Sequence, residues 1–217
     1  MKLFLALTIL LSCLTACMAQ DSQNTFGKTE KEIIAMGETA WHDFYVKQTA
    51  DSTADESNAY GIYATVMQKR NDQLIAQTHN KQAAKIRKYL TDGGNDLTDL
   101  GSNISEGGTI WNIIDANMAA DIEDAINGYL EKKPAPKEHY VVSDVEKQFS
   151  VLAKKIEESH KDTADTMFHY ADARKSLADA RKNFKLTVEF ASHCSRADSD
   201  RFLAIFVDFA KAAEGMA

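Results

Sequence analysis

Residues 143–191 read SDVEKQFSVLAKKIEESHKDTADTMFHYADARKSLADARKNFKLTVEFA, and this stretch decides the fold. It contains no proline or glycine, and its apolar residues recur at alternating steps of four and three. Such spacing places the recurring side chains on one face of a helix. The apolar stripe comprises Val145, Phe149, Leu152, Ile156, Tyr170, Ala173, Leu177, Ala180 and Phe184, with the polar Ser159, Thr163 and Thr166 between its two halves. The pattern predicts one continuous helix over 143–192.

A short internal repeat lies within this stretch. Ala171 to Leu177 (ADARKSL) is followed directly by Ala178 to Phe184 (ADARKNF). A strict seven-residue period is typical of a helix that supercoils against a neighbour, as in a coiled coil.

The whole chain has the composition of a helical globular protein. Hydrophobic residues make up 44% and charged residues 26%, whereas the 217 residues include only 2 prolines and 10 glycines. A β-rich chain with many turns would contain more of both. We therefore expect an all-α fold, an elongated bundle of about five helices around the long helix.

Local signals set the expected helix boundaries. Thr29-Glu30-Lys31-Glu32 has the spacing of a capping box, and Pro134 and Pro136 end the third helix. The expected helices cover 29–48, 55–90, 109–132, 143–192 and 198–214. Residues 29–217 should form a single domain that follows a signal peptide at 1–16 and a short polar tether at 17–28.

The main break in the helical pattern is Thr91 to Gly108, which holds five of the ten glycines. We expect a long loop there, and such loops often carry function. From Thr91 to Glu131 the chain has nine acidic residues and no lysine or arginine. The loop predicts a binding site for a partner protein with a basic surface. The candidate contact residues are Asp92, Asp96, Asp99 and Glu106.

The N-terminus carries an export signal. Met1-Lys2 precedes an apolar run from Leu3 to Ala16, which is too short to span a bilayer comfortably. Leu14-Thr15-Ala16-Cys17 resembles the lipobox of bacterial lipoprotein precursors. That resemblance implies cleavage before Cys17 and attachment of acyl chains such as palmitate to this residue. Met18 after the cysteine implies the outer membrane of the envelope. The alternative is an ordinary signal peptide cut near Ala19 that releases a secreted protein.

The charge and the cysteine content of the chain argue against nucleic-acid binding and against a disulfide framework. The net charge of −7 disfavours nucleic-acid binding, because phosphates need a basic surface. With Cys13 in the signal peptide and Cys17 carrying lipid, Cys194 has no intramolecular partner, so no disulfide framework is expected. We expect Cys194 to be a buried, small apolar side chain.

Catalytic and metal-binding motifs are weak. The sequence has no Gly-x-Ser-x-Gly, Ser-x-x-Lys or His-Glu-x-x-His, and no phosphate-binding glycine loop. Glu157 and His160 have the Glu-x-x-His spacing of di-iron bundles, but no second such motif exists. These two residues are weak metal candidates, and a solvated flank is the favoured interpretation. We expect no cofactor, no metal and no enzyme activity.

The favoured function is a lipid-anchored, non-enzymatic protein-interaction module of the envelope, such as an adaptor, an assembly factor or an immunity-type protein. The alternative is a bundle that binds a metal or a small molecule, with Asn71, Thr78, Ser159 and Thr163 forming a polar layer in the core. The alternative predicts that these residues converge on a pocket. A secreted eukaryotic protein with a glycosylation sequon at Asn103-Ile104-Ser105 ranks last.

Overall fold

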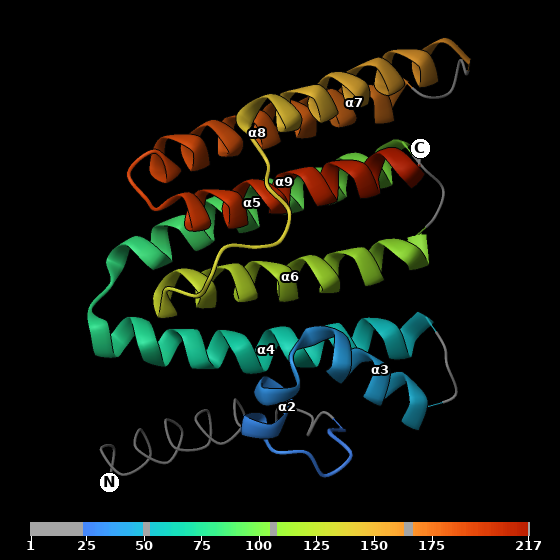
Figure 1. Ribbon diagram of the computed structural model, residues 1–217. Coiled ribbons are helices and arrows are strands. Elements are labelled where there is room, and N and C mark those ends of the chain that lie inside the picture. Colours follow the sequence, from blue (N-terminus) through green and yellow to red (C-terminus); the bar gives the residue numbers. More distant parts are fainter. Residues whose placement is uncertain (1–23, 50–52, 105–107, 163–166, 217) are drawn as a thin grey trace, which may run out of the picture.

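The computed structural model describes residues 24–49, 53–104, 108–162 and 167–216, and the regular secondary structure in these ranges is entirely α-helical (Figure 1). The all-α prediction is therefore confirmed. The described residues form eight helices, so the expected number of about five is wrong. They are α2 (Glu30–Met36), α3 (Glu38–Gln48), α4 (Thr53–Thr78), α5 (Lys81–Ile104), α6 (Gly108–Glu131), α7 (Val142–Asp162), α8 (Met167–Ala191) and α9 (Arg196–Met216).

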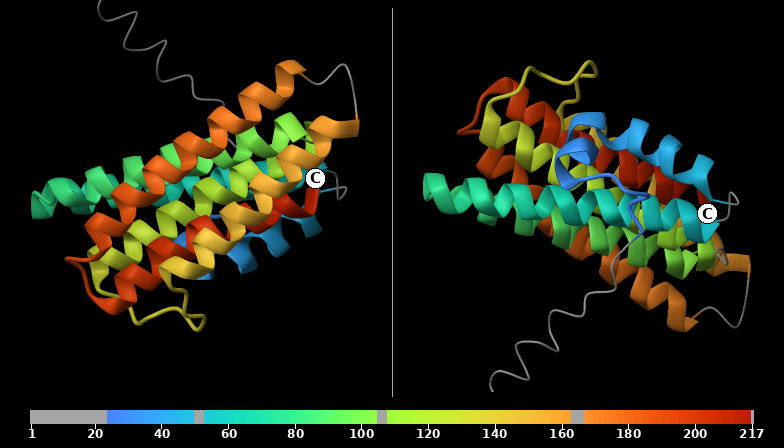
Figure 2. Two further views of the ribbon diagram at one scale, coloured as in Figure 1. Left: turned by 90° about the horizontal axis from the view of Figure 1, so that it is seen from above. Right: turned by 90° about the horizontal axis from the view of Figure 1, so that it is seen from below.

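The helices lie alongside one another in layers (Figure 1). α2 and α3 pack on α4, α4 packs on α6, and α5 contacts α6, α8 and α9. Figure 2 shows α2 and α3 on one outer face and α7 and α8 on the opposite face. Within the described ranges, no helix is both long enough and apolar enough to cross a bilayer.

Two clusters of apolar side chains fill the spaces between these layers. The larger one joins α5, α6, α7, α8 and α9, and every apolar member of the stripe except Tyr170 is buried in it. The smaller one lies between α2, α3 and α4 and includes Trp41, whose indole Nε1 donates to the carbonyl oxygen of Ala59 at 2.8 Å. The stripe read from the sequence is thus a core-facing surface.

The expected loop over Thr91–Gly108 is wrong as far as Ile104, because α5 runs through its first three glycines. All three are buried at helix contacts. A Cβ atom at Gly93 would lie 2.6 Å from the Phe206 ring of α9. Cβ atoms at Gly94 and Gly101 would overlap side chains of α6. Glycine weakens an isolated helix by about 1 kcal/mol relative to alanine, but here it lets two helices approach α5 closely.

The single long helix expected over 143–192 is also wrong. It is two helices, α7 and α8, which pack side by side as a hairpin (Figure 1). The Phe149 ring of α7 meets the Phe184 ring of α8 edge to face, with centroids 5.4 Å apart. A straight helix would hold these two halves of the stripe far apart, whereas the hairpin buries them against each other. Thr163 and Thr166, which interrupt the stripe, lie outside the described residues.

Two other expected helices are each divided by one residue with a left-handed backbone. Gly37 has a φ of 78° and separates α2 from α3. His79 has a φ of 51°, and the next residue, Asn80, caps α5 by accepting from the backbone N–H groups of Gln82 and Ala83. Two other expected boundaries are confirmed. Thr29 forms the capping box at the start of α2, and α6 ends at Glu131, before the two prolines.

Of the four residues expected to form a polar layer in the core, Asn71 and Thr78 are described, whereas the Ser159 side chain and Thr163 lie outside the described part of the chain. Asn71 is buried, but Thr78 is exposed and donates to the Leu74 carbonyl within its own helix. The Asn71 side chain instead donates to the Glu123 carboxylate of α6 at 2.7 Å. That carboxylate also pairs with Arg87 of α5, whose Nε lies 2.9 Å from Oε1. This network joins α4, α5 and α6.

Candidate functional site

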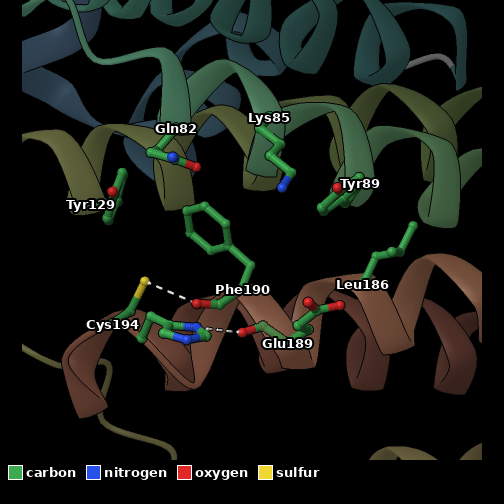
Figure 3. A pocket seen from close by; sticks show the side chains of 9 residues that line it. Gln82, Lys85, Tyr89, Tyr129, Leu186, Glu189, Phe190 and Cys194 are labelled. Carbon is green, nitrogen blue, oxygen red and sulfur yellow. Dashed lines mark hydrogen bonds between the residues drawn. The ribbon is translucent and has the colours of Figure 1, made fainter.

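A groove between α5 and α8 combines apolar, charged and reactive side chains (Figure 3). Its volume is about 360 Å³, within the size range of ligand-binding clefts. Three helices and one turn supply its lining: Gln82, Lys85 and Tyr89 from α5, Tyr129 from α6, Leu186, Glu189 and Phe190 from α8, and His193 and Cys194 from the turn that follows α8. The α5 and α8 side chains face each other across the groove in Figure 3.

Aromatic rings form the floor at one end of the groove. The rings of Tyr129 and Phe190 meet edge to face with centroids 6.0 Å apart. Both also contact the fully buried Phe202 of α9, at 5.8 Å and 6.0 Å. Because Phe202 supports both rings from below, the floor is held in place by the core. It presents half-buried aromatic surface to whatever enters the groove.

The charged groups of the groove lie on its two walls. Lys85 extends from α5, with its Nζ 5.7 Å from the centroid of the Tyr89 ring. Glu189 projects from α8 on the other wall (Figure 3). Both side chains are exposed at the rim, where they remain hydrated. The groove thus has an apolar floor and polar walls, which is the usual arrangement of a recognition site.

The thiol and the imidazole of this groove are not arranged for nucleophilic catalysis. The Cys194 Sγ lies 3.5 Å from the carbonyl oxygen of Phe190, and burial, together with the charge of Asp198, raises the pKa of Cys194. A raised pKa keeps the sulfur in its unreactive thiol form. The His193 Nδ1 lies 2.9 Å from the Glu189 carbonyl, so it is engaged with the backbone of its own helix. Cys194 is half-buried rather than buried as expected.

No protein-family model, curated protein or solved structure matches this chain. The functional proposal below therefore rests on the geometry of this chain's own side chains.

The acidic residues predicted to bind a partner lie along α5 instead of on a loop. Asp92 pairs with Lys88 at 2.6 Å, and Asp96 accepts from Asn183 of α8 at 2.9 Å. Burial raises the pKa of Asp96. Asp99 is exposed, and Glu106 lies outside the described residues. These carboxylates are spread over different surroundings, and the partner-binding role assigned to them stays a prediction.

The structure says little about the metal candidates Glu157 and His160 or about Cys17. Glu157 accepts a hydrogen bond from the Tyr170 hydroxyl at 2.8 Å on the exposed surface, which fits a solvated flank. The His160 side chain and Cys17 lie outside the part of the chain whose placement is described. Among the described residues, no three His, Cys, Asp or Glu side chains cluster in a way that suits a metal ion.

The sequence did not predict a group of half-buried carboxyls between α3 and α6. Glu38, the first residue of α3, accepts from Asn117 of α6 at 3.2 Å and hydrogen-bonds with Asp121. Burial, reinforced by the charges of Asp121 and Asp124, raises the pKa of Glu38 to about 9. Burial also raises the pKa of Asp121 to about 6, and Asp124 accepts from the Tyr63 hydroxyl at 2.9 Å. At neutral pH the pair holds one proton between its two carboxyls, which joins α3 to α6.

Sequence reasoning missed the groove because its residues come from three helices. The sequence held one local signal of this surface. On α8 the polar and basic residues, which include Lys182 and Lys185, recur at helical spacing on a different face from the apolar stripe. The approach of Tyr129 and the α5 side chains to that face depends on how the helices pack, which no local pattern encodes.

Proposed function

We propose that this chain is a lipoprotein of the bacterial envelope, anchored at Cys17 in the outer membrane, that binds a partner protein and catalyses no reaction. The lipobox Leu14–Cys17 directly after the apolar run supports the anchor. Two or three acyl chains would give stable attachment where one is marginal.

The observation that carries the binding role is the groove between α5 and α8. It opens at the surface, its aromatic floor rests on the core, and the pKa of its thiol is raised by burial. The two hydrophobic clusters fill the spaces between the helices with side chains, which favours recognition at the surface over a ligand inside the bundle. Exposed aromatic surface with charges at the rim is typical of a protein-binding site.

The anchor is tested by intact mass. Full-length protein made in a bacterium should begin at Cys17 and carry acyl chains, and Cys17→Ser should lose them. An unlipidated chain that begins near Gln20 in the wild type would contradict the anchor.

The binding role is tested in the same cells by photo-cross-linking. A photoreactive amino acid is placed at Gln82 on the α5 wall or at Ala178, which lines an adjoining hollow on the same face of α8, and at Lys47 on α3 as the control. We expect the same protein to be cross-linked from both groove positions and not from Lys47. Adducts that do not differ between the three positions would contradict a partner site at the groove.

A further inference from the structure

The groove continues along α8 beyond the part drawn in Figure 3. A second depression of about 450 Å³ is lined by Ala178, Arg181, Lys182, Lys185, Leu186 and Glu189. Leu186 and Glu189 line both hollows, so the two adjoin along one face of α8, and together they are called the channel below. From Ala178 to Phe190 this face of α8 is about 18 Å long at 1.5 Å per residue. A channel of this length suits an extended or helical peptide better than a compact small molecule.

The charge of the channel is opposite to that of the protein. Lys85, Lys182 and Lys185 line it from two helices and are exposed. None of the three lies in an ion pair with a carboxylate of the described residues. By contrast, the neighbouring Lys88 is paired with Asp92 at 2.6 Å. In a chain with a net charge of −7, three unpaired lysines at one channel form a local site for negative charge.

The position of the apolar surface adds a second requirement. The aromatic floor of Tyr129 and Phe190 lies at the Cys194 end, and the lysines of α8 lie towards Ala178. A bound segment that fills both parts needs an aromatic or large apolar side chain over the floor, one carboxylate beside Lys85 at the rim of the same hollow, and further carboxylates beside Lys182 and Lys185.

We infer that the channel along α8 binds an acidic peptide segment of the partner protein, with an aromatic side chain over Phe190 and carboxylates beside Lys85, Lys182 and Lys185. This inference rests on the proposed binding function and gives the partner its chemistry. A concave channel with one acidic residue, Glu189, in its middle favours a peptide over a flat anionic membrane. The segment is anchored by burial of its aromatic ring, and the lysines orient it and speed its association.

The test uses the protein as purified from the producing cell in a neutral detergent. The probe is a fluorescently labelled random copolymer of glutamate and tyrosine, with polyglutamate as the aromatic-free comparison. Fluorescence anisotropy should show that the copolymer binds at least tenfold more tightly than polyglutamate. Lys182→Glu with Lys185→Glu should weaken copolymer binding at least tenfold. Equal affinity of the two polymers would overturn the aromatic part of the inference.

A matched control separates the channel from general charge effects. Lys47→Glu with Lys147→Glu makes the same change in net charge at exposed positions on α3 and α7. We expect this variant to bind the copolymer as the wild type does. If both double variants lose affinity equally, binding depends on overall charge and the channel is not the site.

Cys194 provides a direct report of occupancy, because it lines the aromatic end. The copolymer should slow alkylation of Cys194 by N-ethylmaleimide, measured on the Cys194 peptide by mass spectrometry. If alkylation is instead slowed by vesicles that contain phosphatidylglycerol and not by the copolymer, the channel contacts lipid and the inference is wrong. If the copolymer fails to bind while cross-links from Gln82 and Ala178 persist, the acidic segment is wrong and the proposed function stands.

Discussion

Gly101 of α5 lies directly against the indole ring of Trp111 in α6, so closely that a Cβ atom at position 101 would overlap the ring. Both residues are buried, and the contact lies close to the connection between the two helices. The glycine therefore serves as a packing surface within a helix. This contact explains why a segment with the composition of a loop is helical in the folded protein.

Gly101→Ala should destabilise the protein by about 1–3 kcal/mol, because the added methyl group forces the Trp111 ring or the helices to move. Urea denaturation followed by circular dichroism measures the change. Gly61→Ala in α4 is the matched control, since a Cβ atom there meets nothing within 4 Å. It should raise the stability by about 0.5–1 kcal/mol through helix propensity. Equal stability of Gly101→Ala and the wild type would contradict the close packing of α5 on α6.

Removing one partner of the ion pair between Arg87 and Glu123 should be strongly destabilising, because it leaves a buried charge without compensation. The Glu123 side chain is only 8% exposed and the Arg87 side chain 16%. Arg87→Ala leaves the buried carboxylate without its cation and should cost about 3–5 kcal/mol. The exposed pair of Lys88 and Asp92 provides the comparison, and Lys88→Ala should cost less than about 1 kcal/mol. Thermal melts of the two variants should therefore differ clearly, and similar losses would show that Arg87 is not a buried partner.

The proton held by Glu38 and Asp121 makes stability depend on pH. The pKa of Glu38 is higher in the folded protein than in the unfolded chain, so the folded state binds more protons between about pH 4.5 and about pH 9. Stability from this group is complete below the unfolded pKa and is lost as the pH rises through that window. We expect the melting temperature of the wild type to fall across it.

Glu38→Gln cannot ionise and should remove much of this dependence. At pH 8 it should stabilise the protein by about 1 kcal/mol, which corresponds to ~2–4 °C in Tm for a chain of this size. Glu146→Gln on the exposed surface of α7 is the control and should leave the pH profile unchanged. A profile that is the same in wild type and Glu38→Gln would mean that the pair does not share a proton.

The thiol of Cys194 should react slowly. Burial raises its pKa, and its Sγ lies against the Phe190 carbonyl. Alkylation by iodoacetamide at pH 7.5 should be at least about tenfold slower than that of an exposed thiol. The exposed reference is Ser192→Cys in a Cys194→Ala background. Alkylation of Cys194 in urea should match the reference, and a fast reaction in the native protein would contradict its half-buried position.

Much of the fold follows from local patterns. The stripe over 143–191 was expected on one helical face, and Phe149, Leu152 and Phe184 are indeed buried on it. The capping box at Thr29 and the end of α6 before Pro134 depend only on neighbouring residues, so they could be located from the sequence. The number of helices could not, because a single residue such as Gly37 or His79 turns the chain without disturbing the apolar pattern on either side.

Local sequence patterns could not predict the groove or the pair formed by Glu38 and Asp121. Lys85 and Glu189 line the same groove only because α5 and α8 pack together, and Glu38 reaches Asp121 only because α3 lies near α6. This packing removes water from around Glu38 and so raises its pKa. The sequence alone does not show where water is excluded.

The sequence by itself determined that this protein is helical and which side chains of the stripe over 143–191 face inward, because helix formation and apolar periodicity are local properties of the chain. The tertiary structure decided where the helices stop and which of them meet. It turned a glycine-rich segment into the buried part of α5, because close contacts with α6 and α9 outweigh the weak helix propensity of glycine. It also folded the stripe into the α7–α8 hairpin, because apolar surface is removed from water only when distant parts of the chain come together.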